Sequence, residues 1–315
     1  MSEAVTAAPL KTRGVWTRFG QSDLWYSFTR KPLVMAAAAL TLLFFLAAAF
    51  APVIAPQDPF NPAELDLMDS ELPPAWAEEG SGEYLLGTDN QGRDILSTIM
   101  YGSRISLLVG FASVLFAVVV GVGVGLLSGF IGGWVDSALM RLADIQLTIP
   151  AILIALMVDG VARTLLPEGT REELAIPVLI FAIGISTWPQ YARVVRSGTM
   201  SEKTQDYVAS ARIIGTPGPV ILFRHILPNI LGPVLVIGTI GLALAIILEA
   251  TLSFLGVGVP PTTPSLGTLI KVGEQFLFSG QWWITVFPSA ALVLLALSVN
   301  LLGDWLRDAL NPRLR

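Results

Sequence analysis

The sequence predicts an all-α membrane protein with six transmembrane helices. Of its 315 residues, 53% are hydrophobic and only 14% are charged, and the mean hydropathy is +0.68. Soluble domains carry about 25% charged residues, whereas a helix that crosses the ~30 Å hydrocarbon core needs about 20 apolar residues in succession. The chain has six apolar segments of about this length, so we expect it to fold within a bilayer.

The six predicted spans are separated by loops that hold most of the charge. They cover residues 33–55, 105–135, 136–158, 174–192, 226–248 and 282–303. We expect a kink at Ile149–Pro150 in the third span and a break near Trp188–Pro189 in the fourth, because proline removes a helical hydrogen bond. Arg141 and Asp144 are expected to pair in the third span, since residues three apart are neighbours on a helix.

Charge sorting predicts the orientation. Residues 1–31 carry five Lys or Arg residues interleaved with aromatic residues, which favours a helix at the headgroup level, with a polar tail as the alternative for residues 1–14. Residues 56–91 carry nine acidic residues and no Lys or Arg. Fourteen of the 19 Lys and Arg residues fall on one side of the six-span topology. The positive-inside rule therefore places both termini in the cytosol.

These features divide the chain into four units. They are a cytosolic N-terminal segment (1–31), the first span with its acidic outer loop (32–104), a core of five further spans (105–303) and a cytosolic tail (304–315). In the outer loop, Asp89 or Asn90 can cap a helix that begins near Arg93. Residues 256–281 contain a helical pattern over 266–278, which could enter the membrane only where protein covers it. Trp282 and Trp283 are expected in the interfacial aromatic belt.

One face of the second span lacks side chains. Gly121, Gly125 and Gly129 repeat every four residues, which permits close contact with another helix. We predict a packing role for these glycines.

Asp144 and Glu249 are the candidate acids of a transport pathway, because ionisable residues in spans are costly to bury. Each has a structural alternative. For Asp144 it is a salt bridge at the interface, and for Glu249, placed at the end of the fifth span, it is a hydrogen bond to Thr251 or Ser253.

The sequence lacks the motifs of an enzyme. It contains no G-x-x-x-x-G-K-[ST] phosphate loop, no H-E-x-x-H and no G-x-S-x-G. It has no cysteine and one histidine, which excludes disulfides, thiolate metal sites and a cysteine nucleophile. We therefore predict a chain that catalyses no reaction and binds no cofactor or metal itself. No basic footprint for nucleic acid is present.

The loop at residues 193–228 contains the segment that we expect to dock another protein. Asp206 can cap a short helix, Gly215 stands where a helix C-terminal glycine is expected, and Pro217 prevents continuation. An apolar helix then restarts, and Pro228 is expected to separate it from the fifth span. An amphipathic helix on the membrane surface is the alternative. The candidate docking residues are Asp206, Tyr207, Ala209, Ser210, Ala211, Arg212 and Gly215.

This loop resembles the cytoplasmic loop of permease subunits of binding-protein-dependent ABC importers. The family's loop reads Glu-Ala-Ala, three residues, Gly, and about ten residues before Leu-Pro. Ser210 and Ala211 match the two Ala positions, Gly215 matches the Gly, and Leu227–Pro228 match the end. Ala209 stands where the family usually has Glu, so any ion pair made by that Glu is absent.

Four further blocks are similar to the C-type permeases of dipeptide and oligopeptide importers. They are LGTDNQGRDILSTIMYGSRISL (86–107), FRHILPN (223–229), EATLSFLGVGVPPTTPSLG (249–267) and NLLGDWLRDALNPRLR (300–315). Their order and spacing match over residues 30–315. The resemblance implies the type I ABC importer permease fold, with a cytosolic coupling helix in residues 206–229.

The resemblance also implies an assembly in the bacterial inner membrane. A second homologous permease would complete the pore, two ATPase subunits would bind ATP and magnesium, and an extracytoplasmic binding protein would deliver peptides. Nickel and glutathione are alternative cargoes in the same branch. An ion-coupled carrier is a competing class, but it should show mid-span acids and an inverted repeat. An intramembrane hydrolase is a third, and it lacks its motifs here.

Overall fold

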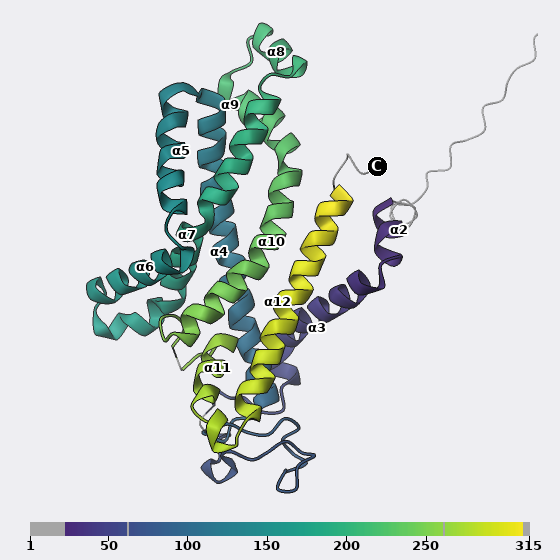
Figure 1. Cartoon of the computed structure of the whole chain (residues 1–315), viewed down its shortest axis with the longest axis vertical. Coiled ribbons are helices and arrows are strands. Elements are labelled where there is room, and N and C mark those ends of the chain that lie inside the picture. Colours follow the sequence, from purple (N-terminus) through teal and green to yellow (C-terminus); the bar gives the residue numbers. More distant parts are fainter. Residues whose placement is uncertain (1–22, 62, 261, 311–315) are drawn as a thin grey trace, which may run out of the picture.

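A computed structural model describes residues 23–61, 63–260 and 262–310 (Figure 1). Within these ranges the chain consists of helices and loops, with one isolated β-bridge between Thr88 and Asp94. Five helical segments are long and apolar enough to cross a membrane, and a bent pair of shorter helices makes a sixth. The predicted all-α class with six spans is confirmed. Of the predicted N-terminal helix, the described part is α2 (Asp23–Thr29), and residues 1–22 lie outside the described ranges.

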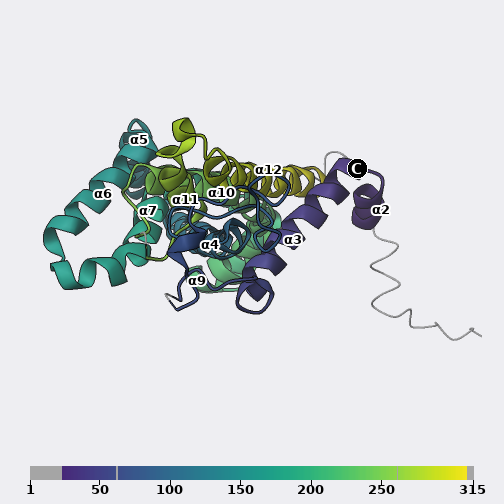
Figure 2. The same ribbon diagram turned by 90° about the horizontal axis from the view of Figure 1, so that it is seen from below.

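The spans extend further than their apolar stretches suggested. They are α3 (Pro32–Ile54), α4 (Ile95–Ile131), the pair α5 (Gly133–Leu147) and α6 (Ala151–Leu165), α7 (Arg171–Glu202), α10 (Leu227–Phe254) and α12 (Trp283–Leu310). The second and fourth spans gain about three turns at one end, because a helix continues through polar interfacial residues that hydropathy does not mark. Seen from below, α6 projects on one side and α2 with α3 on the other (Figure 2).

Short elements connect the spans. Toward one end of the molecule lie α8 (Asp206–Ile213), α9 (Gly218–Val220) and the π-helix η3 (Ile221–Ile226). Toward the other lie the loop before α4 with η1 (Leu67–Asp69), and α11 (Leu266–Glu274) followed by η4 (Leu277–Ser279) (Figure 1). A single turn, η2 (Glu168–Thr170), precedes α7.

Helices α4 and α7 form the closest packed pair. A methyl group added at Gly121, Gly125 or Gly129 would lie 2.5–2.8 Å from atoms of α7, closer than real carbon contacts. The absence of side chains on this face lets the two backbones approach each other, as the glycine spacing predicted. The chain then turns at Gly132 and Gly133, whose φ angles of 74° and 60° favour glycine.

The third span is broken rather than continuous. Helices α5 and α6 meet at 92° across Thr148–Pro150. The kink was predicted at this proline, but an uninterrupted span from 136 to 158 was wrong. Proline disfavours helical geometry in the residue before it and removes its own N–H from the ladder, so a helix readily ends there.

The predicted break at Trp188–Pro189 was also wrong, because α7 continues through it. Pro189 cannot donate to the carbonyl of Ile185. The side chain of Gln146 supplies the missing donor: its Nε2 donates to the Ile185 carbonyl oxygen, and its Oε1 accepts from Trp188 Nε1 at 2.9 Å. A side chain at the end of α5 thus completes the hydrogen bonding of α7.

Pro228 does not separate two helices either, since η3 runs directly into α10 and Pro228 is the second residue of α10. The π-helical turn before it, in which the Leu227 N–H donates to the Leu222 carbonyl, accommodates a residue that has no N–H. The segment from Gly218 to Phe254 is therefore one span.

The loop before α4 is held by a buried ion pair. Asp89 and Arg93 are almost fully buried and lie 2.7 Å apart. Asp94, not Asp89 or Asn90, caps α4 by accepting from the Ser97 N–H at 2.7 Å. Trp283 is buried against this loop, and its Nε1 donates to the Thr88 carbonyl at 3.1 Å. This bond joins the start of α12 to the loop.

Helix α11 lies inside the protein. Leu266 and Leu269 are buried in the cluster that joins α4, α10 and α12. A methyl group at Gly267 would lie 2.4 Å from the Ala250 carbonyl oxygen, and one at Gly273 would lie 2.6 Å from that of Ile284. This burial meets the condition under which the helical pattern after residue 256 was expected to enter the membrane.

Candidate functional site

Helix α8 protrudes beyond the ends of the spans, at the opposite end of the molecule from α11 (Figure 1). Gln205, not Asp206, occupies its N-cap position, and no side chain caps it. Asp206 lies in the first turn, where a carboxylate is favoured by the helix dipole.

The end of α8 is a Schellman turn. Gly215 has a φ of 81°, its N–H donates to the Arg212 carbonyl at 3.0 Å, and the Thr216 N–H donates to the Ala211 carbonyl at 3.0 Å. This hydrogen-bond pair satisfies two carbonyls that a helix end otherwise leaves unpaired, and the left-handed residue is usually glycine. The predicted C-terminal glycine is confirmed.

The two faces of α8 differ sharply. Val208 and Ala211 are buried in a cluster with Ile221, Leu222 and Ile226 of η3. Ala211, which we expected on the docking surface, therefore faces the protein.

The outward face is formed by four of the candidate residues together with two unexpected ones. Asp206, Ala209, Ser210 and Arg212 are exposed, and Ile213 and Ile214 are 87% and 82% exposed. Ile214 stands at helical spacing from Val208 and Ala211, but α8 ends at Ile213 and the Schellman turn redirects the chain there, so Ile214 is exposed. Two large apolar side chains are thus exposed to solvent at the end of α8, a pattern typical of a protein–protein contact.

Tyr207 attaches α8 to two spans. Its hydroxyl donates to Glu202 Oε2 at 2.6 Å and accepts from Asn229 Nδ2 at 3.1 Å. Glu202 ends α7, whereas Asn229 is in the first turn of α10. Partial burial, and then the hydrogen bond to Glu202, raise the pKa of the Tyr207 phenol above its usual value. Tyr207 therefore acts as a donor at neutral pH.

Lys203, in the loop before α8, attaches it to α4. Its Nζ donates to the Phe130 carbonyl at 2.5 Å and lies 5.8 Å from the centre of the Phe130 ring. The Phe130 carbonyl lies in the last turn of α4, where carbonyls lack a partner within the helix, and a lysine side chain can satisfy such a group. Through Lys203 and Tyr207, the α8 loop contacts α4, α7 and α10.

Two ion pairs join α5 to α7. Arg196 contacts Asp136 through Nε and Nη2 at 2.5 and 2.6 Å, and Arg193 Nη2 lies 2.5 Å from Asp144. The predicted pair between Arg141 and Asp144 was wrong, because α7 packs beside α5 and offers Asp144 a nearer cation. Asp144 is half exposed, as its structural alternative required.

Glu249 is fully buried within α10, five residues before the helix ends at Phe254. It accepts from Ser253 Oγ at 2.8 Å and from Ser106 Oγ at 2.7 Å. The bond to Ser253 was predicted, whereas Thr251 instead donates to the Ile247 carbonyl. Ser106 also accepts from the Leu266 N–H at 3.3 Å, so this carboxyl joins α4, α10 and α11. Spacing along one helix could not reveal the contact with α4.

Within the described ranges, no three His, Asp or Glu side chains are grouped so as to hold a metal ion. The geometry of the described residues offers an exposed helix face and buried polar contacts. Comparison with known proteins places this arrangement in a family.

Residues 121–315 match the family described as binding-protein-dependent transport system inner membrane component. The match covers more than half of the chain. The chain belongs to this family. Residues 21–74 also match the N-terminal transmembrane domain of oligopeptide transport permease C.

Relatives align along almost the full chain. The dipeptide transport system permease protein of Haemophilus influenzae is 40% identical over 93% of this chain and 95% of its own. The di/tripeptide permease of Pseudomonas aeruginosa and the glutathione permease of Pectobacterium atrosepticum are each 36% identical over 93% of this chain, and 92% and 91% of their own. The chain is thus an ABC importer permease of the peptide-transport branch, an inner-membrane component that leaves ATP hydrolysis to separate ATPase subunits.

A solved structure supports the fold. The inward-facing methionine ABC transporter MetNI includes a chain that superposes with a TM-score of 0.54 at 20% identity, covering 68% of this chain and 96% of that chain. This likeness, with the family match, confirms the type I importer permease fold.

Proposed function

We propose that this chain is one of two homologous permease subunits of an importer that moves di- or oligopeptides into the cytosol by alternating access. Two ATPase subunits supply the energy, and an extracytoplasmic binding protein delivers the peptide. The ATPases dock on the outward face of α8, within residues 206–229. Both chain termini lie on the same cytosolic side as α8.

The observation that carries this proposal is the position and attachment of α8. Its outward face is exposed to solvent, while its inward face is packed in the cluster with η3. A partner that binds Ile213 and Arg212 would therefore bind a helix, α8, that is fixed to the rest of the subunit. Tyr207 and Lys203 connect that element to α4, α7 and α10.

The same contacts suggest how movement passes into the membrane. ATP binding would close the ATPase pair and displace α8. The hydrogen bonds of Tyr207 would carry the displacement to the ends of α7 and α10, and the glycine contact would make α4 follow α7. Packed helices that move as units are a common element of two-state transitions. Asp144 and Glu249 remain candidate pathway residues in this scheme.

Peptides are favoured as cargo because the relatives named for dipeptides and di/tripeptides align over 93% of the chain. Glutathione is the second candidate, since a relative named for its transport aligns over the same share. Nickel is a third, and it rests only on the sequence resemblance.

Reconstitution tests the proposal. The chain would be produced with a homologous permease, the two ATPases and the binding protein, and the purified complex placed in proteoliposomes. We expect ATP-dependent uptake of a labelled dipeptide that requires every subunit. Uptake by this chain alone, driven by an ion gradient without ATP, would instead support the ion-coupled carrier.

A further inference from the structure

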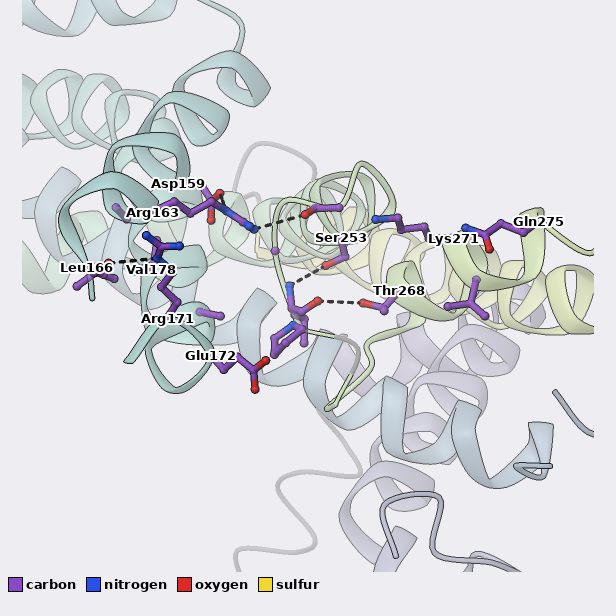
Figure 3. Close-up of a pocket in the computed structure, with 17 residues that line it drawn as sticks. Asp159, Arg163, Leu166, Arg171, Glu172, Val178, Ser253, Thr268, Lys271 and Gln275 are labelled. Carbon is purple, nitrogen blue, oxygen red and sulfur yellow. Dashed lines mark hydrogen bonds and ion pairs between the residues drawn. The ribbon is translucent and has the colours of Figure 1, made fainter. Parts of the chain in front are cut away.

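A cavity of about 440 Å³ lies beside α11 (Figure 3), in the half of the molecule away from α8 (Figure 1). Its walls come from α6, the start of α7, the loop after α10 and α11. Sites for small ligands usually measure about 300–1,000 Å³ and combine apolar walls with a few polar groups. None of the predicted docking or pathway residues lines this cavity.

Two cations from different helices converge in it. The side chains of Arg163 (α6) and Lys271 (α11) point toward each other (Figure 3). Between them lies Gly256, whose carbonyl accepts from Arg163 Nη2 at 3.4 Å. A methyl group at Gly256 would lie 2.3 Å from Lys271 Nζ, and its φ of 82° also favours glycine. Because Gly256 has no side chain, the side chains of Arg163 and Lys271 can both approach its backbone.

The positive charge in this space is only partly balanced. Arg163 Nε pairs with the buried carboxylate of Asp159 at 2.5 Å. Within the described residues, Lys271 has no hydrogen bond to a side chain and no ion pair. An ammonium group beside a guanidinium can bind an incoming anion through charge-assisted hydrogen bonds.

The α7 wall adds a third cation, Arg171, which is already engaged by Glu168 at 3.7 Å and by the Leu166 carbonyl at 3.1 Å. The remaining walls add an acid and hydroxyl groups. Glu172 contributes a carboxylate from the α7 wall, and Ser253 and Thr268 contribute hydroxyl groups (Figure 3). A lining with charges of both signs suits a zwitterion better than an acidic lipid headgroup, which would face Asp159 and Glu172 as like charges. The acidic residues thus favour a small ligand that carries an ammonium group as well.

We propose that this cavity receives the transported peptide and holds its C-terminal carboxylate between Lys271 and Arg163. The inference rests on the proposed import of peptides and adds a peptide site within this subunit. Lys271 is then a binding residue, whereas Asp159 positions the Arg163 guanidinium.

Lys271→Gln in the complete reconstituted importer tests the proposal. Lys271 is the cation to change, because removing Arg163 would leave Asp159 buried without its partner. Uptake would be measured for a dipeptide and for the same dipeptide with a C-terminal amide. We expect about tenfold slower uptake of the free acid at subsaturating concentration, and unchanged uptake of the amide. Arg104→Gln removes an exposed cation in the third turn of α4, outside the cavity; it is the matched control and should change neither rate.

The outcomes separate the two proposals. Absence of peptide uptake by the unmodified complex contradicts the proposed function. Normal uptake with no effect of Lys271→Gln contradicts only the peptide site. Equal loss for the free acid and the amide also overturns it, because the cation would then serve an acidic lipid or an acidic side chain of the binding protein.

A labelling experiment needs neither a variant nor the binding protein. The complex of the two permeases and two ATPases would be treated with an amine acetylating reagent, and modification read by mass spectrometry. We expect the free-acid dipeptide to slow acetylation of Lys271 severalfold and the amide to have no effect, with Lys203 as the internal reference. Equal acetylation of Lys271 with and without the free acid would overturn the site.

Discussion

At the scale of single residues, α8 depends on a few side chains that act through defined contacts. The Tyr207 hydroxyl bonds to the ends of two spans, and Lys203 Nζ donates to the Phe130 carbonyl in the last turn of α4. Gly215 ends the helix in a conformation that other residues rarely adopt. The outward residues Arg212 and Ile213 are therefore presented at a fixed angle.

Gly215→Val should distort this presentation. A β-branched residue at a φ of 81° is strained by roughly 1–2 kcal/mol, although no neighbouring atom lies within 4 Å of the added carbon. We expect normal amounts of the complex and at least a threefold lower ratio of peptide transported to ATP hydrolysed. Gly238→Val, within a helix (α10) and also with nothing within 4 Å of the added carbon, but without a positive φ, is the control. An unchanged ratio in Gly215→Val would contradict a coupling role for this turn.

At the scale of helices, two contacts decide how the spans are arranged. The glycine face of α4 fixes its distance from α7, and Gln146 joins the end of α5 to the interior of α7. The α4–α7 contact depends on the small volume of the glycines, whereas the contact of Gln146 with α7 depends on hydrogen bonds.

Gly125→Ala should destabilise the α4–α7 pair. The added methyl would lie 2.5 Å from the Ala192 carbonyl oxygen, and forced overpacking typically costs about 1–3 kcal/mol. We expect a lower Tm of the purified complex in detergent. Gly123→Ala, two residues away on the exposed face with nothing within 4 Å, should leave Tm unchanged or slightly raised. A similar Tm for both variants would show that the glycine face does not set the packing.

Gln146→Leu should destabilise the protein by about 1–3 kcal/mol, because the Ile185 carbonyl and Trp188 Nε1 would each lose a partner. Adding Pro189→Ala restores an N–H four residues after Ile185. We therefore expect the double variant to recover part of the lost Tm relative to Gln146→Leu alone. Equal Tm values for the single and double variants would argue against the role assigned to Gln146.

At the scale of the whole molecule, the sequence predicted the parts that depend on local chemistry. Hydropathy located the spans, and Gly215 and the glycine repeat were recognised because their conformation or volume is a property of one residue. The errors arose where distant segments meet. Gln146 donates to the Ile185 carbonyl that Pro189 leaves without a donor, Asp144 pairs with Arg193 rather than Arg141, and Ser106 donates to Glu249. No spacing along the chain reveals these partners.

The candidate docking surface shows the same limit. Of the small residues proposed for docking, Ala209 and Ser210 are exposed and Ala211 is buried, whereas the exposed Ile213 and Ile214 were not among the candidates. The cluster with η3 determines which face of α8 is buried, and the Schellman turn determines where Ile213 and Ile214 lie. The exposure of Ile213 and Ile214 is the strongest indication of a protein partner, and it is evident only from the folded structure.

The most direct test of the account is the response of the complete importer to a change confined to the outward face of α8. In the paired change Arg212→Glu and Ile213→Asp, the cation and the apolar tip are lost, while Val208, Ala211 and Gly215 keep α8 folded. We predict that the variant permease inserts and binds its partner permease normally, but retains at most a tenth of the ATPase subunits on co-purification and transports no peptide. Full recovery of the ATPases with normal ATP-driven uptake would contradict the claim that α8 couples this subunit to the ATPases.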